Sequence, residues 1–185
     1  ILTHAHSDHS AAIPLLYKFG YRGPVYCTAP TRDIAALLTL DYIGVAFKEA
    51  KKAPYSSSDI KEMVKHTICL DYEEVYDITP DIRLTLYNAG HTLGSAMAHL
   101  HIGNGLHNFL YTGDFKYQKT ALLEAAPTKF PRLETVMIEA TYGGKDNILP
   151  PREKAEEELI NIITATTERN GKVLIPVLGV GRAQE

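Results

Sequence analysis

The chain has 185 residues, of which 45% are hydrophobic and 22% charged, and this balance excludes disorder, collagen-like repeats and a coiled coil. Its formal net charge is −3, from 19 basic and 22 acidic residues, so no overall positive field indicates a nucleic-acid partner. Two cysteines are too few for a disulfide scaffold, and no apolar run reaches the roughly 20 residues that span a bilayer. We therefore expect a cytoplasmic protein with no membrane partner.

In the first part of the chain, helix signals alternate with short apolar strands. Gly20 is placed to end a helix, and Thr31 and Asp59 are residue types that cap helix N-termini. In chain order, the pattern predicts a buried strand at 1–3, a polar loop at 4–9, a helix at 10–19, a strand at 25–28, a helix capped by Thr31 and a helix from Asp59 to His66.

From about residue 72 the pattern changes to strands. In chain order, it predicts strands at 82–86, 96–102, 109–112 and 135–138, a helix opened by Pro151, and a last strand at 173–177. Strands flanked by helices imply a layered α/β architecture. The Leu-Pro-Pro step at 149–151 is the expected domain boundary, so residues 1–150 form one domain and residues 151–185 begin a second.

The most informative segment is His4-Ala5-His6-Ser7-Asp8-His9, directly after the first predicted strand. It places four metal-competent side chains within six residues, and a tight loop at a strand end can direct them to one point. Imidazole suits Zn²⁺, and a carboxylate can bind the ion or orient a water molecule. A single surface histidine would mean little, but this spacing predicts a metal site.

Two later loops add further candidate ligands. His91 lies in Gly90-His91-Thr92-Leu93-Gly94-Ser95 between two predicted strands, where Gly90 can take a positive φ that a side chain would hinder. Asp114 follows a predicted strand in Thr112-Gly113-Asp114, where a carboxylate behind a glycine is well placed to bridge two cations. All of these donors are expected to converge.

H-x-H-x-D-H after a strand, then G-H-x-x-G-S, then T-G-D resembles the metallo-β-lactamase superfamily. This resemblance implies a four-layer αββα sandwich, here incomplete, with two Zn²⁺ ions at the sheet edges. It implies that His4, His6 and His91 hold one zinc ion, Asp8 and His9 hold the second, and Asp114 bridges the two. Two divalent ions about 3.5–4 Å apart can clamp the attacking and leaving oxygens of a phosphodiester.

The end of the chain favours one branch of this superfamily. Glu139-Ala140-Thr141-Tyr142-Gly143 resembles motif A of the β-CASP nucleases, and residues 171–185 resemble the start of the β-CASP cassette. His6 stands where the flavodiiron branch usually has Glu, which argues against a di-iron redox site. The amino-acid sequence of the whole chain is similar to archaeal homologues of the cleavage and polyadenylation specificity factor nuclease subunit.

This resemblance implies a zinc-dependent ribonuclease that cuts single-stranded RNA as an endonuclease and a 5′-to-3′ exonuclease, in RNA 3′-end processing, transcription termination or decay. Asp8 would orient the attacking water, and Glu139 would hydrogen-bond a histidine of a later motif. Arg182 would meet an RNA phosphate, or equally would form a salt bridge. The chain has no initiator Met, and we expect a piece of a longer, homodimeric protein that alone would be a poor nuclease.

Two other functions fit part of the pattern. A hydrolase of small esters or thioesters, of the glyoxalase II type, could use the same metal ligands, although the β-CASP-like residues argue against it. A non-catalytic scaffold subunit of an RNA-processing complex is the second alternative, although relatives of that kind lose zinc ligands and this sequence keeps them.

Overall fold

The computed structural model describes the backbone of residues 1–185 and the side chains of all of them except Arg182. The chain divides into two compact units, Ile1–Glu139 with Gln184–Glu185, and Ala140–Ala183. The predicted domain boundary after residue 150 stays a prediction, because a compact unit is not in itself a family domain. The phosphate contact predicted for Arg182 falls outside the described side chains.

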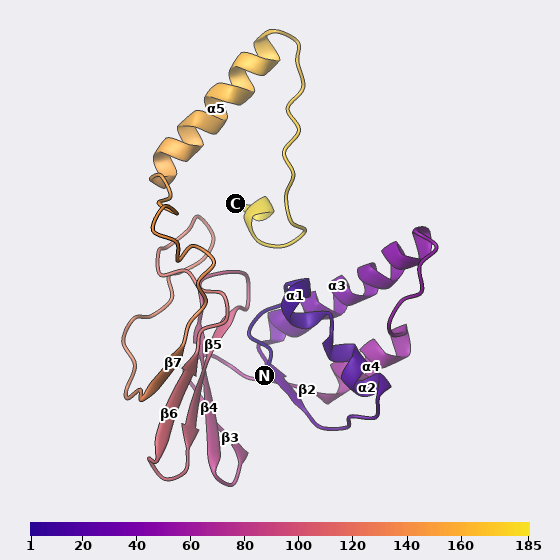
Figure 1. Ribbon diagram of the computed structural model, residues 1–185, viewed down its shortest axis with the longest axis vertical. Helices are drawn as coiled ribbons and strands as arrows, with labels where there is room; N and C mark the ends of the chain where they lie inside the picture. Colours follow the sequence, from indigo (N-terminus) through magenta and orange to yellow (C-terminus); the bar gives the residue numbers. More distant parts are fainter. The chain divides into compact units, whose positions relative to one another are not determined.

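The first unit combines short and long helices with two sheets (Figure 1). Its helices are α1 (Ser7–Ser10), α2 (Ile13–Lys18), α3 (Ala29–Lys48) and α4 (Ser57–His66). Its strands are β1 (Val25–Cys27), β2 (Thr67–Cys69), β3 (Val75–Thr79), β4 (Ile82–Asn88), β5 (Ala96–Ile102), β6 (His107–Tyr111) and β7 (Thr135–Met137). This mixed α/β arrangement is consistent with the predicted metallo-β-lactamase fold.

The strands form a parallel pair, β1–β2, and a five-stranded sheet in the order β3-β4-β5-β6-β7. Strands β3 to β6 are antiparallel neighbours, and β7 runs parallel to β6. Asn88 pairs with Ala96, and Tyr111 pairs with Ala98, so the end of β4, the start of β5 and the end of β6 share one end of the sheet. The loops that carry His91 and Asp114 therefore leave the sheet at the same end.

The parallel pair lies between the helices and the larger sheet. Val25 and Cys27 pack into an apolar cluster with residues of α2, α3 and α4, while Tyr26 packs against a cluster that holds Leu84 and Leu86 of β4. Successive side chains of a strand point to opposite faces, which is how β1 serves both clusters. A third cluster around Met97 includes residues of the loop after β6.

Two helix caps differ from the sequence prediction. Helix α3 is capped by Thr28, whose hydroxyl accepts from the backbone N–H of Thr31 at 3.3 Å, so Thr31 lies inside the first turn. Helix α4 is capped by Ser56, and Asp59 completes a capping box by accepting from the Ser56 backbone N–H at 2.8 Å. Both predicted caps lie three positions after the observed one. In each case the predicted and the observed residue are both types that cap helices, so the sequence alone did not distinguish them.

Three predicted strands also differ. Residues 1–3 are not part of a strand, although Leu2 donates to the Tyr26 carbonyl at 2.9 Å and Thr3 accepts from Ala96 at 2.7 Å. Strand β7 exists but is exposed rather than buried, with Val136 at 48% exposure. Residues 173–177 form no strand within the described part of the chain, where no other strand pairs with them.

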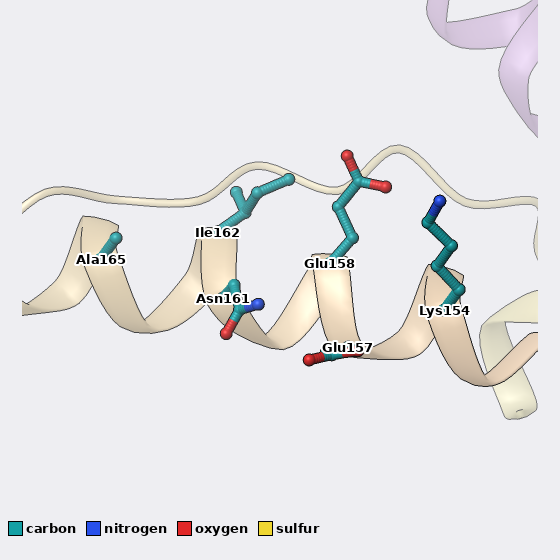
Figure 2. Close-up of a pocket in the computed structure, with 6 residues that line it drawn as sticks. All are labelled: Lys154, Glu157, Glu158, Asn161, Ile162 and Ala165. Atoms are coloured by element: carbon teal, nitrogen blue, oxygen red, sulfur yellow. The ribbon is translucent and has the colours of Figure 1, made fainter.

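The second unit contains α5 (Arg152–Glu168), which begins after Pro151 as predicted, and the short 3-10 helix η1 (Arg182–Gln184) starts at its end. Figure 2 shows a shallow hollow along α5, lined by residues of that helix: Lys154, Glu157, Glu158, Asn161, Ile162 and Ala165. None of these residues belongs to the metal site predicted from the sequence. Among the described residues, no helix is both long and apolar enough to cross a membrane.

Candidate metal centre

Three segments that are far apart in the sequence bring histidine and aspartate side chains together. The first follows Thr3, the second is the loop between β4 and β5, and the third follows β6. One nitrogen each of His4, His6 and His91 and one oxygen of Asp114 all lie within 4.8 Å of one another. The three sequence motifs predict that these four residues converge, across 110 positions of the chain (114 − 4).

The three imidazoles point ring nitrogens at a common point. His6 Nδ1 lies 3.2 Å from His4 Nε2 and 3.1 Å from His91 Nε2. The rings meet nearly at right angles, with interplanar angles of 82° to 87° between the three pairs. This arrangement brings one nitrogen of each ring close to the other two rings without stacking the rings.

Asp114 presents its two oxygens to two different groups of ligands. Its Oδ2 lies 3.8 Å from His4 Nε2 and 3.6 Å from His91 Nε2, whereas its Oδ1 lies 3.6 Å from His9 Nε2. A carboxylate divided in this way faces two neighbouring positions for a cation. The role of Asp114 as a bridge, predicted from the sequence, is geometrically possible.

Asp8 and His9 lie on the outer side of the cluster. His9 Nε2 is 3.3 Å from Asp8 Oδ2, and both residues belong to α1. The Asp8 side chain is 77% exposed, while that of His9 is 22% exposed. Asp8 is therefore the carboxylate of the site that a molecule in solution reaches most readily.

Glycines at positive φ shape the two loops that carry His91 and Asp114. Gly90 has φ +65° as predicted, and a Cβ there would lie 2.6 Å from the Lys116 carbonyl oxygen. Gly113, directly before Asp114, has φ +53°, and a Cβ there would lie 2.7 Å from Thr3 Oγ1. The absence of a side chain lets the aspartate loop approach the segment that carries the first histidine.

The His91 loop is held from two directions. The buried Ser95 hydroxyl accepts from the backbone N–H groups of His91 at 3.1 Å and Thr92 at 3.0 Å. At Gly94, φ is +80° and the carbonyl oxygen accepts from the hydroxyls of Thr28 at 2.7 Å and Thr31 at 2.8 Å. The start of helix α3 is thus joined directly to a loop that carries a candidate ligand.

His4 is fully buried, and its surroundings favour the neutral ring. Burial, and after it the charges of His9, His91 and His6, lower the pKa of His4 to about 3. Thr3 Oγ1 lies 3.3 Å from His4 Nδ1, which leaves His4 Nε2 facing the other ligands. A metal ligand needs the neutral imidazole, and a hydrogen bond to its second nitrogen orients the ring.

This donor set fits a zinc ion by its chemistry and its spacing. Nitrogens bound at 2.0–2.1 Å to a tetrahedral ion are separated by about 3.3 Å, close to the 3.1 and 3.2 Å found between His6 and its neighbours. Three imidazoles and one carboxylate are a common ligand set for zinc. His4, His6, His91 and Asp114 could hold one ion, while Asp8, His9 and Asp114 offer donors for another.

Glu139 is a predicted site residue that stands outside this cluster. The backbone N–H of Glu139 donates to Thr112 Oγ1 at 3.3 Å, which places Glu139 beside the end of β6, but its predicted catalytic role stays a prediction. The sequence analysis assigned no role to Thr3, Thr28 or Ser95, although each supports a ligand loop. Of these three residues, only Ser95 could have been found from the sequence, because it lies four residues after His91 in the same motif.

Residues 1–139 match the family described as the metallo-beta-lactamase superfamily domain, and the chain belongs to this superfamily. The superfamily predicted from the three motifs is therefore confirmed. Members of it bind metal ions, and the His/Asp cluster is the possible site for them in this chain.

The chain is also similar over its whole length to archaeal proteins. It is 61% identical over 185 residues to the transcription termination factor FttA of Methanothermobacter thermautotrophicus and to that of Methanocaldococcus jannaschii. The FttA of Lokiarchaeum sp. is 58% identical over 185 residues. The chain spans 29% of the length of each of these relatives. These similarities confirm the archaeal branch predicted from the sequence.

Proposed function

We propose that this chain supplies the metal centre of a zinc-dependent ribonuclease that hydrolyses phosphodiester bonds of single-stranded RNA during transcription termination or RNA 3′-end processing. The observation that carries the proposal is the divided carboxylate of Asp114, with one oxygen near His4 and His91 and the other near His9. Two ions side by side suit the displacement at a phosphodiester better than a single ion does.

RNA is proposed as the substrate on the basis of the similar archaeal proteins and of the sequence outside the metal cluster. The similar archaeal proteins carry the name transcription termination factor, a role that involves a transcript. Residues 139–143 and 171–185 resemble β-CASP nucleases, which favours a phosphodiester of a nucleic acid as the substrate. RNA binding, a soluble cytoplasmic protein and homodimerisation through other regions are parts of this proposal.

Each donor has a proposed task. When bound, the ions stabilise negative charge on phosphate oxygens and lower the pKa of water. His4, His6 and His91 would hold the first ion, Asp8 and His9 the second, and Asp114 both. Two divalent ions against two carboxylates leave about two positive charges, so the site attracts phosphate although the chain has a net charge of −3. Asp8, exposed beside His9, would orient the attacking water and accept its proton.

The test is RNA cleavage by a protein of the relatives' length that carries this chain. Loaded with zinc, it should cut single-stranded RNA, and a chelator should stop the reaction until zinc is returned. Asp8→Asn should lower the rate by about 10²- to 10⁴-fold, the usual contribution of a group that moves a proton. The control is His107→Ala, on β6 and outside the cluster, which should leave cleavage unchanged.

Two results would favour the other functions. Hydrolysis of a glutathione thioester without cleavage of RNA would indicate a small-ester hydrolase on the same ligands. Failure to bind zinc, together with RNA binding but no turnover, would indicate a scaffold subunit. Metal analysis of the purified protein distinguishes the last case before any kinetic measurement.

A further inference from the structure

The two cysteines of the chain lie opposite each other in the β1–β2 pair. Cys27 and Cys69 are partners in the parallel register, and both thiols are free in the structure. Neighbouring strands lie about 4.7–4.9 Å apart, which is inside the 4.4–6.8 Å separation of Cα atoms that a disulfide allows. The backbone therefore holds the two residues at bridging distance.

Both side chains point to the same face of this pair. In β1, burial alternates from Val25 to Cys27 with the less buried Tyr26 between them, and in β2 only the central Ile68 is exposed. Because side chains alternate along a strand and register partners share a face, Cys27 and Cys69 project together toward the helices. Cys27 is part of the apolar cluster beneath them.

Charged groups near the pair include Arg32 and Asp33 in the first turns of α3 and the amino group of Ile1. The pKa of Cys27 is raised to about 12, first by burial and then by Cys69, whereas Arg32 acts to lower it. The hydrogen bond to Asp33 chiefly raises the pKa of Arg32, and both thiols contribute in the same direction. The charge of Arg32 therefore favours the thiolate form of Cys27.

We propose that Cys27 and Cys69 form an intramolecular disulfide when the folded chain meets a low-molecular-weight disulfide as oxidant. The Cys69 thiolate attacks one sulfur of the oxidant and releases a first small thiolate, leaving a mixed disulfide on Cys69. The Cys27 thiolate then attacks Cys69 Sγ and releases the second. The two cysteines lose two protons and two electrons, and the oxidant is reduced to two thiols.

Accessibility fixes this order of attack. Cys27 is 0% exposed, so the oxidant cannot reach it, whereas Cys69 is half-buried. Cys27 needs no access to solvent, because its target is the sulfur across the strand pair. The mixed disulfide therefore forms on Cys69 before the bridge closes.

The bridge would join β1 to β2 covalently. It closes a loop from residue 27 to residue 69, which contains α3 and α4. A cross-link over a loop of this length restricts the unfolded chain, and it should raise the midpoint of thermal unfolding by roughly 5–10 °C. The metal cluster contains neither cysteine, so this modification is separate from the proposed function.

The test is oxidation of the reduced, folded chain with oxidised glutathione, followed by trypsin digestion and mass spectrometry without reductant. The expected product joins the peptide of residues 23–32 to that of residues 66–83, with a loss of about 2 Da for the two hydrogens. Dithiothreitol should reverse both the link and the rise in the unfolding midpoint. Cys27→Ser should stop at the glutathione adduct of Cys69, and Cys69→Ser should give no adduct.

Three results would overturn the proposal. The first is a stable glutathione adduct on Cys69 of the unsubstituted chain that does not close. The second is a folded chain in which neither cysteine reacts. The third is a link that forms only in denaturant, because the register of β1 and β2 would then have no part in it.

Discussion

Replacement of Gly94 by alanine should disconnect the His91 loop from the start of helix α3. Gly94 has φ +80°, and an added Cβ would lie 2.7 Å from Thr28 Oγ1, 2.8 Å from Pro30 Cβ and 2.9 Å from the Thr31 nitrogen. None of these atoms is the free end of a flexible side chain. The loop itself must therefore move, and its carbonyl must leave the two threonine hydroxyls.

The magnitude follows from three contributions. A left-handed conformation costs an alanine about 1–2 kcal/mol. Crowding in a packed region costs about 1–3 kcal/mol, and each of the two lost hydroxyl bonds costs about 0.5–1.5 kcal/mol. Gly94→Ala should therefore lower the free energy of unfolding by about 3–8 kcal/mol.

Gly105→Ala is the matched control, because Gly105 has a similar φ of +84° but its nearest neighbour to an added Cβ, Arg132 Nη1, lies 3.8 Å away. This variant carries the conformational cost alone. Urea unfolding of both variants, followed by circular dichroism in the presence of a chelator, gives the difference between them. We expect Gly94→Ala to be less stable than Gly105→Ala by at least about 2 kcal/mol.

The same variant should also weaken zinc binding, because the displaced loop carries His91. A loss of about 10- to 100-fold in affinity is expected, as for other changes that disturb the support of a ligand. Equal stability of the two variants, or unchanged zinc affinity in Gly94→Ala, would refute the role assigned to this carbonyl.

Three further predictions concern single side chains. Asp114→Asn should lower zinc affinity about 10- to 100-fold and reduce the number of bound ions in a calorimetric titration, whereas Asp41→Asn on the exposed side of α3 should change neither. Ser95→Ala leaves two backbone N–H groups without their acceptor and should lower the free energy of unfolding by about 2 kcal/mol; a change below about 0.5 kcal/mol would count against it. Burial, then the charge of His101, lowers the pKa of His99, so the unfolded chain binds more protons below about pH 6.5 and stability should fall there as pH falls. Urea unfolding at several pH values should show a weaker dependence for His99→Gln, and identical slopes would contradict this account.

The site could be predicted from the sequence because its donors lie next to strong local signals. The spacing from His4 to His9 is short enough to act as a unit, and His91 and Asp114 follow strands whose alternating patterns are clear. An antiparallel pairing of those strands places both loops at one end of the sheet. The sequence and the elementary geometry of a sheet together explain the convergence.

The supporting contacts could not be predicted, because they depend on how the layers pack. The hydrogen bond from Thr28 to Gly94 spans 66 positions, and the sequence around neither residue predicts the contact. The choice between Ser56 and Asp59 as a cap depended on geometry, since each suits that place. Apolar composition predicted a buried β7 and a strand at 173–177, but burial and strand pairing depend on which elements pack against a segment, and composition does not reveal that.

The donors of the candidate centre come from both layers of the first unit. His4, His6 and His9 lie on the segment that leads into the helices, and His91 and Asp114 lie on loops of the large sheet. An ion shared among them would link the helical segment to the loops of the sheet, and the full donor set exists only when both are in place. During synthesis no complete donor set exists until residue 114 has left the ribosome, so loading should follow assembly of the unit. Hydrogen exchange at the seam between helices and sheet should then slow once the ion is bound, because binding to the folded state alone opposes every opening that separates the donors.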